Sequence, residues 1–150
     1  MNLQITKEKV LEAASKCSTA KETLKTLFPE VFNLKITERV KSFEDACAIK
    51  GISVSSVFYH TDTKDIIAYK KLVIIVSVLN EGWTPDWKDS NQYKYYPYFS
   101  MTSSGFGFSY TLYGTWSAAT VVGSRLCFKS SELSEYAGKK FGGIYNDFLN

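Results

Sequence analysis

Two aromatic-rich segments, residues 93–102 and 106–113, flank a short Ser-Ser-Gly sequence. In the second segment Phe, Tyr and Leu alternate with small and polar residues, so its apolar side chains gather on one face of a strand. Gly105 takes the third loop position, where a hairpin of this loop length calls for a left-handed residue. Pro97 removes a ladder donor from the first segment, which is typical of an edge strand or a bulge. Together these features predict an antiparallel β-hairpin.

The first 51 residues contain the start and stop signals of three short helices. Thr6, Ser18 and Ser42 stand before them as N-cap residues, and an acidic residue three positions after Ser42 gives a weaker form of the capping box. Pro29 ends the second helix and Gly51 the third. The apolar residues at helical spacing are Val10, Leu11 and Ala14, then Leu24, Leu27 and Phe28, then Phe43, Ala46, Cys47 and Ile49.

The apolar stretch that follows Thr61 and Thr63 supports two interpretations. Its apolar residues recur at helical spacing from Ile66 to Leu79, which predicts a helix buried on most sides. Residues 72–79, however, are rich in β-branched side chains, which favour a buried strand. Gly82 lies where a helix C-terminus is expected, so we predict a helix and keep the strand as the alternative.

The end of the chain predicts a third strand and a last helix. Residues 120–128 suit the strand, and Ser130 caps the helix with Glu132 near its positive end. The helix contains three glycines, the first of them Gly138, and each costs about 1 kcal/mol relative to alanine. We attribute them to close packing against the aromatic sheet, with contact to a partner as the alternative. The apolar stripe of this helix is Leu133, Tyr136, Ala137, Phe141, Ile144, Tyr145 and Phe148.

Aromatic residues and positive charge separate along the chain. Residues 81–150 hold 17 of the 23 aromatic residues, whereas residues 1–80 hold 12 of the 18 basic residues. No Pro/Gly/Ser-rich linker marks the change, so residues 1–150 are predicted to form a single domain of two layers. The fold class is α+β: N-terminal helices, a small antiparallel sheet of about three strands, and a C-terminal helix packed on the sheet.

Charge and cysteine content exclude several classes of protein. The net charge of +3 is weaker than that of a dedicated nucleic-acid binder. The three cysteines lie far apart and form neither a disulfide framework nor a zinc knuckle, which favours a reducing compartment. The longest apolar run is much shorter than the about 20 residues of a membrane helix, and the first residues lack a signal-peptide pattern. We therefore expect a soluble, cytoplasmic protein, or one packed inside an assembly, with no membrane partner.

Catalytic and metal-binding patterns are scarce in this sequence. His60 is the only histidine, and no Gly-x-Ser-x-Gly elbow accompanies it. One histidine and three scattered cysteines do not make a standard zinc site, and the aspartates do not match a calcium loop. No P-loop or dinucleotide fingerprint is present. We expect no cofactor, no metal and no enzymatic activity.

Two segments leave a functional alternative open. Glu81 and Asp86 beside Trp83 and Trp87 resemble the acids and aromatic rings of a carbohydrate site, but the same residues suit a loop held by two indoles. Residues 44–57 have the spacing of small and aliphatic residues that is typical of a helix-turn-helix. The stretch that would contact bases, residues 54–60, contains no Lys or Arg. We interpret the first segment as a structural loop and the second as a plain helical hairpin.

The strongest surface signal is the aromatic run at residues 93–99. A strand sends alternate side chains to opposite faces, so the core does not take up all of these rings. They form one aromatic core face with hydroxyls in solvent, or anchor a protein interface, or stack on nucleic-acid bases beside nearby cations. Arg125, on the outer face of the predicted third strand, pairs with a carboxylate or receives an anionic partner. The candidate binding residues are Tyr93, Lys94, Tyr95, Tyr96, Tyr98, Arg125, Lys129, Trp83 and Trp87.

Four motifs stand out in the second half. They are Asn-Glu-Gly-Trp-Thr-Pro-Asp-Trp at 80–87, Tyr-Lys-Tyr-Tyr-Pro at 93–97, Gly-Ser-Arg-Leu-Cys-Phe-Lys-Ser at 123–130 and Glu-Tyr-Ala-Gly-Lys-Lys-Phe at 135–141. With these motifs the chain resembles an uncharacterised family of small proteins from phages and prophages of gut Bacteroidetes. The resemblance spans about residues 36–149, which makes 36–150 the family-like core and 1–35 an added helical arm. It also favours the helix at 72–79.

The resemblance implies a phage setting but brings no known activity, cofactor or catalytic residue. We expect a non-catalytic, phage-associated binding protein that serves as a protein-interaction or virion-associated module, in the host cytoplasm or in the virion. A nucleic-acid-binding accessory protein is the alternative. A small enzyme acting on a sugar or a nucleotide is a remote alternative.

Overall fold

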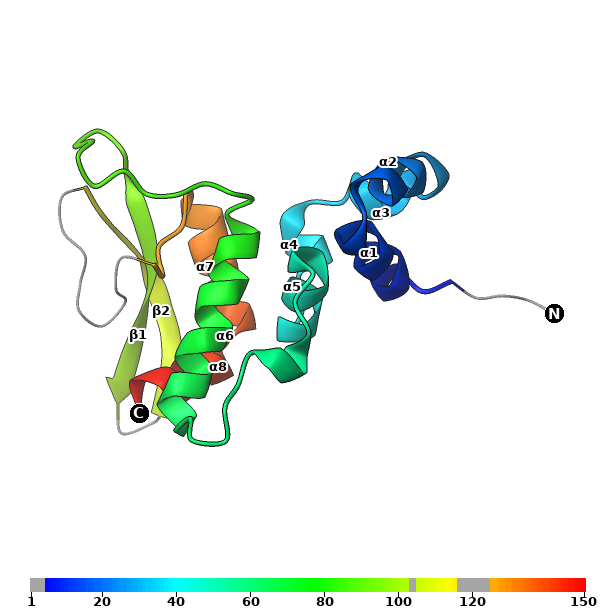
Figure 1. Ribbon diagram of the computed structural model, residues 1–150. Helices are drawn as coiled ribbons and strands as arrows, with labels where there is room; N and C mark the ends of the chain where they lie inside the picture. The colour runs from blue at the N-terminus through cyan, green and yellow to red at the C-terminus, as the bar shows by residue number, and fades with distance from the viewer. Residues whose placement is uncertain (1–4, 103–104, 116–124) are drawn as a thin grey trace.

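The computed structural model describes residues 5–102, 105–115 and 125–150 (Figure 1). Its N-terminal helices begin and end largely where the predicted capping residues stand. Thr6 caps α1 (Lys7–Lys16) by accepting a hydrogen bond from the backbone N–H of Lys9. Ser18 was predicted to be an N-cap, and this is wrong. It is the first residue of α2 (Ser18–Leu27). Because α1 ends at Lys16, the extended residue Cys17 both closes α1 and opens α2.

The next helices are short and locally determined. Pro29 ends α2 as predicted and also begins α3 (Pro29–Phe32), where its fixed φ suits a first helical position. The short α4 (Ile36–Arg39) was not predicted. Ser42 opens α5 (Phe43–Lys50) with a complete capping box, and Gly51 ends it in the left-handed conformation. The prediction of a helical hairpin over residues 44–57 is wrong. After α5 the chain forms one 3-10 turn, η1 (Val54–Ser56), and not a second helix.

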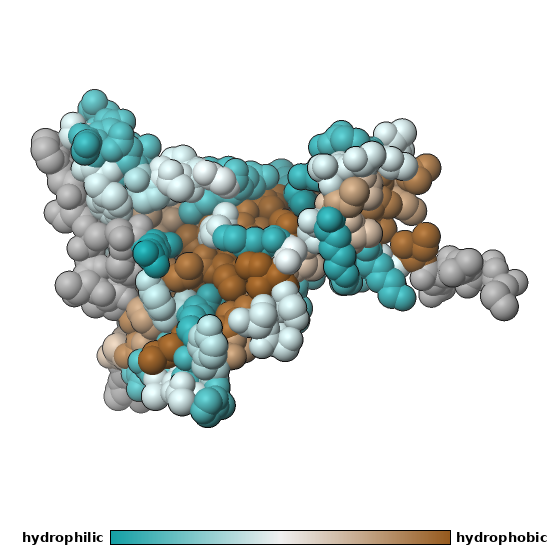
Figure 2. Space-filling view, viewed as in Figure 1, coloured by the Kyte–Doolittle hydropathy of each residue, from teal (hydrophilic) through white to brown (hydrophobic). Residues whose placement is uncertain are grey.

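The ambiguous apolar stretch is a helix, α6 (Lys64–Leu79). It packs between α5 and the C-terminal helix α8. Burial on both sides explains why β-branched residues are accepted there, since tertiary packing overrides helix propensity. Figure 2 shows apolar residues gathered over α6 and its junction with α5, and Ile66 on α6 is 42% exposed.

The predicted hairpin is confirmed as β1 (Lys94–Thr102) paired antiparallel with β2 (Gly105–Gly114). Gly105 has a φ of +122°, as the turn requires. It is the first residue of β2, paired with Thr102, so it is not a third loop residue. The ladder shifts between Tyr98 and Phe99, one residue after Pro97, and leaves Ser109 as the extra residue of β2.

The described sheet has two strands, so the prediction of about three is wrong for this part of the chain. Residues 120–124 of the predicted third strand lie outside the described residues. Of the remainder, only Phe128 pairs with β1, through two backbone hydrogen bonds with Tyr95 of 3.0 and 2.7 Å. Arg125 lies in a turn. The other side of this segment contacts the end of α6, as described below.

The predicted last helix is two helices, α7 (Ser131–Lys140) and α8 (Gly142–Leu149). Ser130 caps α7 as predicted. The chain turns at the buried Phe141, next to two glycines that weaken helix continuation. A Cβ at Gly138 would overlap the ring of Phe108 and touch Pro97. The close packing predicted for this first glycine is therefore confirmed.

Two apolar clusters hold the described residues together. The main one contains side chains of the helices α4, α5, α6, α7 and α8 together with residues 126 and 128, and one face of the hairpin packs against it. Tyr136 on α7 also donates a 2.8 Å hydrogen bond from its hydroxyl to the carbonyl of Val40. The smaller cluster consists of Val10, Leu11 and Val31 with neighbouring side chains. None of the helices in the described ranges is long and apolar enough to cross a membrane.

Candidate functional site

The hairpin positions most of the candidate binding residues, and strand alternation divides them between two faces. Tyr95, Pro97 and Phe99 point toward the helices. The ring of Phe99 lies 4.8 Å from the fully buried ring of Tyr145 on α8. The opposite face, here called the outer face, carries Tyr96 and Tyr98. One half of the aromatic run therefore belongs to the core and the other half does not.

The outer face presents a stacked pair of tyrosines. Tyr98 and its cross-strand partner Tyr110 have ring centroids 4.8 Å apart and ring planes 24° apart. Their side chains are 44% and 49% exposed. Half-buried Tyr96 and Leu112 face each other two pairs further along the ladder, on the same face. Stacking holds the two exposed rings in one geometry, so little side-chain entropy remains for a partner to remove.

A second group of tyrosines lies where the hairpin strands end. Tyr113 is 61% exposed, Tyr93 is 50% exposed, and their rings meet edge to face at 4.9 Å. The half-buried ring of Tyr95 lies 6.1 Å from Tyr113 and 6.2 Å from Tyr93. This group continues the core face of the sheet, because Tyr95 also packs against the main apolar cluster.

Lys94 is the clearest departure from the predicted site. It was predicted as a surface cation, but its exposure is 1%. Its Nζ donates hydrogen bonds to the backbone carbonyls of Asp89 (2.9 Å) and Thr115 (3.1 Å). It also lies 5.5 Å from the centre of the Trp87 ring. The ammonium is thus held inside the chain by two carbonyls and an aromatic face, and it is not available to a ligand.

The acidic and tryptophan residues of segment 81–92 also serve local structure. Asp86 accepts a 2.8 Å hydrogen bond from the N–H of Lys88, and Asp89 one of 2.8 Å from the N–H of Asn91. Trp83 and Trp87 are half-buried. No group of three or more His, Cys, Asp or Glu residues within the described ranges lies close enough to hold a metal ion. The interpretation of this segment as a structural loop agrees with these contacts.

The two remaining candidate cations differ in availability. Lys129 forms a 2.9 Å ion pair with Glu81, which ties the segment after the Phe128 bridge to the end of α6. Arg125 is exposed and makes no ion pair with a described carboxylate. Lys94 and Lys129 flank the Tyr95–Phe128 bridge, but both ammonium groups have partners within the chain. These residues therefore do not offer a continuous row of accessible positive charge.

Asn80 organises this region, although the sequence analysis gave it no role beyond a position in a motif. Its side chain is buried at the end of α6. The amide Nδ2 donates to the carbonyl of Cys127 at 2.8 Å, and Oδ1 accepts from the N–H of Lys129 at 3.0 Å. One side chain thus replaces the pairing that a further strand would give this segment. The nearest signal in the sequence was an amide residue at a predicted helix end.

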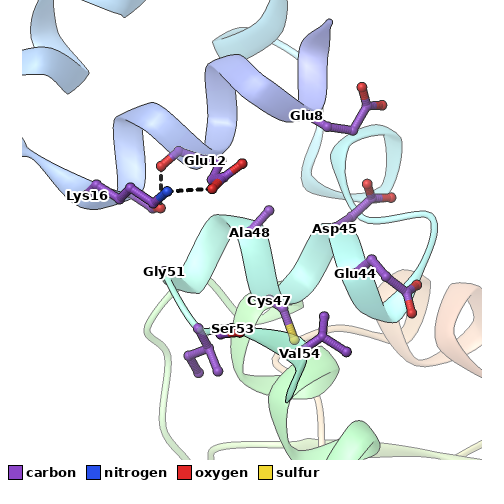
Figure 3. Close-up of a pocket in the computed structure, with 12 residues that line it drawn as sticks. Glu8, Glu12, Lys16, Glu44, Asp45, Cys47, Ala48, Gly51, Ser53 and Val54 are labelled. Atoms are coloured by element: carbon purple, nitrogen blue, oxygen red, sulfur yellow. Dashed lines mark hydrogen bonds and ion pairs between the residues drawn. The ribbon is translucent and has the colours of Figure 1, made fainter. Parts of the chain in front are cut away.

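A separate cavity of about 550 Å³ lies between α1 and α5 (Figure 3). Four carboxylates line it, those of Glu8, Glu12, Glu44 and Asp45, and three of them have local structural roles. Glu12 pairs with Lys16 on its own helix, and Asp45 belongs to the capping box of α5. Hydrogen bonds with its own backbone N–H and with Thr6 lower the pKa of Glu8. The lining shows how two helices meet and does not by itself indicate a ligand.

Among the described residues, none of the three cysteines lies in a cluster with His, Asp or Glu residues that could hold a metal ion. Burial raises the pKa of the Cys127 thiol to about 11 and raises that of Cys47 as well. Hydrogen bonds from the backbone N–H groups of Ala20 and Thr19 lower the pKa of exposed Cys17. No disulfide joins any two of these three residues.

Comparison of the chain with protein-family models, with curated proteins and with solved structures gave no significant match.

Proposed function

We propose that this chain is a non-catalytic, phage-associated binding protein that works as a protein-interaction or virion-associated module. The observation that carries the proposal is the stacked pair Tyr98 and Tyr110 on the outer face of the hairpin. Both rings are half exposed, while the other face of the same strands packs on α7. The helices fix the strands, so the outer rings are held on a rigid support.

A protein partner fits this face better than a nucleic acid does. Tyrosine supplies a large apolar ring, a hydroxyl and only two side-chain torsions, which is why it is enriched where proteins meet. The neighbouring cation Lys94 is withdrawn into the chain. Stacking on single-stranded nucleic acid usually needs a basic groove beside the rings, and the described residues around Tyr98 do not supply one.

The phage setting is proposed from the resemblance of the four motifs, and with it a location in the host cytoplasm or in the virion. A role in either place requires a stable partner surface and no chemistry. A sugar or nucleotide enzyme stays the remote alternative, and it is less favoured because Asp86 accepts a hydrogen bond from the N–H of Lys88 and Glu81 pairs with Lys129.

The test is affinity capture from infected and lysogenic host cells. It compares the wild type, a Y98A/Y110A double variant and the control Y59A. Tyr59 is 69% exposed and lies beside Lys70, away from the hairpin. We expect the wild type and Y59A to retain the same phage or host protein after nuclease treatment, and the double variant to lose it.

Two results would contradict the proposal. Capture that disappears with nuclease, together with a gel shift on single-stranded DNA or RNA, would assign the face to nucleic acid. Equal capture by all three proteins, with circular dichroism showing each one folded, would place the binding surface elsewhere.

A further inference from the structure

Among the residues that the structure describes, one edge of β2 has no strand beside it. One edge of β2 pairs with β1, and no other described strand pairs with the second edge. β1 differs, because its second edge is partly occupied by the bridge between Tyr95 and Phe128. An open edge presents a row of backbone N–H and C=O groups that can pair with another strand.

This edge also lacks the usual protection against pairing. Proteins block open edges with lysine, proline or inward-pointing charges. β2 has none of these between Gly105 and Gly114, and its sequence contains no Asp, Glu, Lys, Arg or Pro. The one irregularity is the shift at Ser109. Near the two-fold axis of such a pair the same side chains of the two copies lie close together, so an uncharged sequence there avoids repulsion.

Space is available beside the edge. Two cavities of about 470 and 400 Å³ follow β2 from Phe106 to Thr111, and Phe108 and Lys139 line both of them. α7 borders them and runs antiparallel to β2, because Phe108 lies at Gly138 and Thr111 donates to Ser134 at 3.2 Å. Because they share Phe108 and Lys139, the two cavities are here called together the groove between β2 and α7.

We propose that β2 pairs antiparallel with β2 of a second copy of this chain, across a two-fold axis between Ser109 and Tyr110. The two hairpins then form one continuous four-stranded sheet with α7 of both copies on the same face. A two-fold interface must be self-complementary, since the same surface is used by both copies. Both the register and the charges along this edge meet that requirement.

The register follows from the shift in the ladder. Before Ser109 the residues on the core face are Phe106 and Phe108, and after it they are Thr111 and Tyr113. Directly opposed residues in an antiparallel pair lie on the same face. An axis between Ser109 and Tyr110 satisfies this rule, because Phe108 then faces Thr111 and Phe106 faces Tyr113 of the second copy. The exposed ring of Tyr113 gains an aromatic cross-strand partner.

The charges on α7 follow the same symmetry. Glu135 and Lys139 line the groove at the level of the proposed axis. They form an ion pair one helical turn apart on α7 and are exposed. Because the two α7 helices are antiparallel across the axis, Glu135 of each copy comes opposite Lys139 of the other. Two reciprocal attractions result, so the pattern favours a second copy over an unrelated strand.

The experiment is sedimentation equilibrium of the purified chain between about 1 µM and about 1 mM, the span of moderate to weak association. We expect a monomer–dimer equilibrium for the wild type. E135K and K139E each place like charges opposite one another, and each is expected to weaken the dimer by about tenfold or more. A mixture of the two single variants is expected to form a heterodimer, and the double variant E135K/K139E to recover the dimer.

A second pair of variants tests the strand itself. S109K places two ammonium groups beside the axis and is expected to abolish the dimer, whereas S109N keeps it. Circular dichroism confirms that each variant is folded. A wild type that stays monomeric throughout would overturn the proposal, as would single charge variants that dimerise like the wild type. The outcome is distinguishable from that of the proposed function, because E135K and K139E change only contacts of α7 and leave Tyr98 and Tyr110 in place.

Discussion

The side chain of Asn80 gives the sharpest test of how the two halves of the chain are joined. Replacing it with alanine removes the donor to Cys127 and the acceptor for Lys129. The bond to Cys127 is buried and the bond to Lys129 is partly buried. Removing one partner of such a hydrogen bond costs about 1–3 kcal/mol, so for the two bonds we expect N80A to lower the free energy of unfolding by about 2–6 kcal/mol.

The measurement is thermal and urea unfolding followed by circular dichroism. For a chain of this size each kcal/mol shifts the Tm by about 2–4 °C, so a loss near the middle of that range lowers it by about 10 °C. N33A is the matched control, because Asn33 also follows a helix end but is exposed. If N80A melts with the wild type and N33A, the two bonds do not hold the segment and the reasoning is refuted.

N80D adds a dependence on pH to the same test. An ionised carboxylate in place of the amide would face the carbonyl of Cys127, so repulsion and burial raise the pKa of the introduced acid above its unfolded value. The protonated form, which can still donate, is therefore favoured in the folded state. We expect N80D to be nearest to the wild type in stability below the unfolded pKa, and the difference to grow as pH rises to 7.

Three further expectations follow from single contacts. G138A should lower the free energy of unfolding by about 1–3 kcal/mol, because the added methyl meets the hairpin, while G142A, with open space around it, should be neutral or nearly so; equal melting of the two would contradict this packing. Thiol titration at pH 8 should label Cys17 quickly and the two buried cysteines only after denaturation, and three rapid reactions in native buffer would contradict their burial. The hydrogen bond from Lys70 lowers the pKa of Asp62, so its stabilisation is present above the unfolded pKa and is lost as pH falls through the folded one; D62N should destabilise the protein at pH 7 and have a smaller effect at pH 2, and an equal loss at both values would contradict the ionic origin.

Local signals explain the features that the sequence predicted correctly. The capping box at Ser42, the left-handed Gly51 and the positive φ of Gly105 each depend on residues close together in the chain. Such interactions can be identified from a few letters of sequence. The hairpin and the N-terminal helices were predicted for this reason, and errors such as the cap at Ser18 were shifts of a single residue.

The failures arose where distant segments meet. Strand alternation predicts which face Lys94 takes, but not that the carbonyls of Asp89 and Thr115 close over its ammonium. In the same way, no pattern near residue 127 indicates that Asn80, 47 positions earlier, will pair with it. The candidate site therefore lost Lys94 as an accessible cation, while the exposure of Tyr98 lay within the predicted alternatives. The prediction that Tyr110 shares one apolar face with Phe106 and Phe108 is wrong, because the shift at Ser109 turns Tyr110 to the outer face.

The small apolar cluster of Val10, Leu11 and Val31 has a consequence for how the protein opens. α2 contributes no buried residue, and the first helices join the rest mainly where α1 packs on α5. Opening residues 7–32 exposes far less apolar surface than global unfolding, so its free energy is correspondingly smaller. Backbone amides in α2 should exchange with deuterium through this sub-global opening, whereas those of α6 should exchange only through complete unfolding. A protease added to the native protein should first cut between α2 and α4 and leave the hairpin with its supporting helices intact.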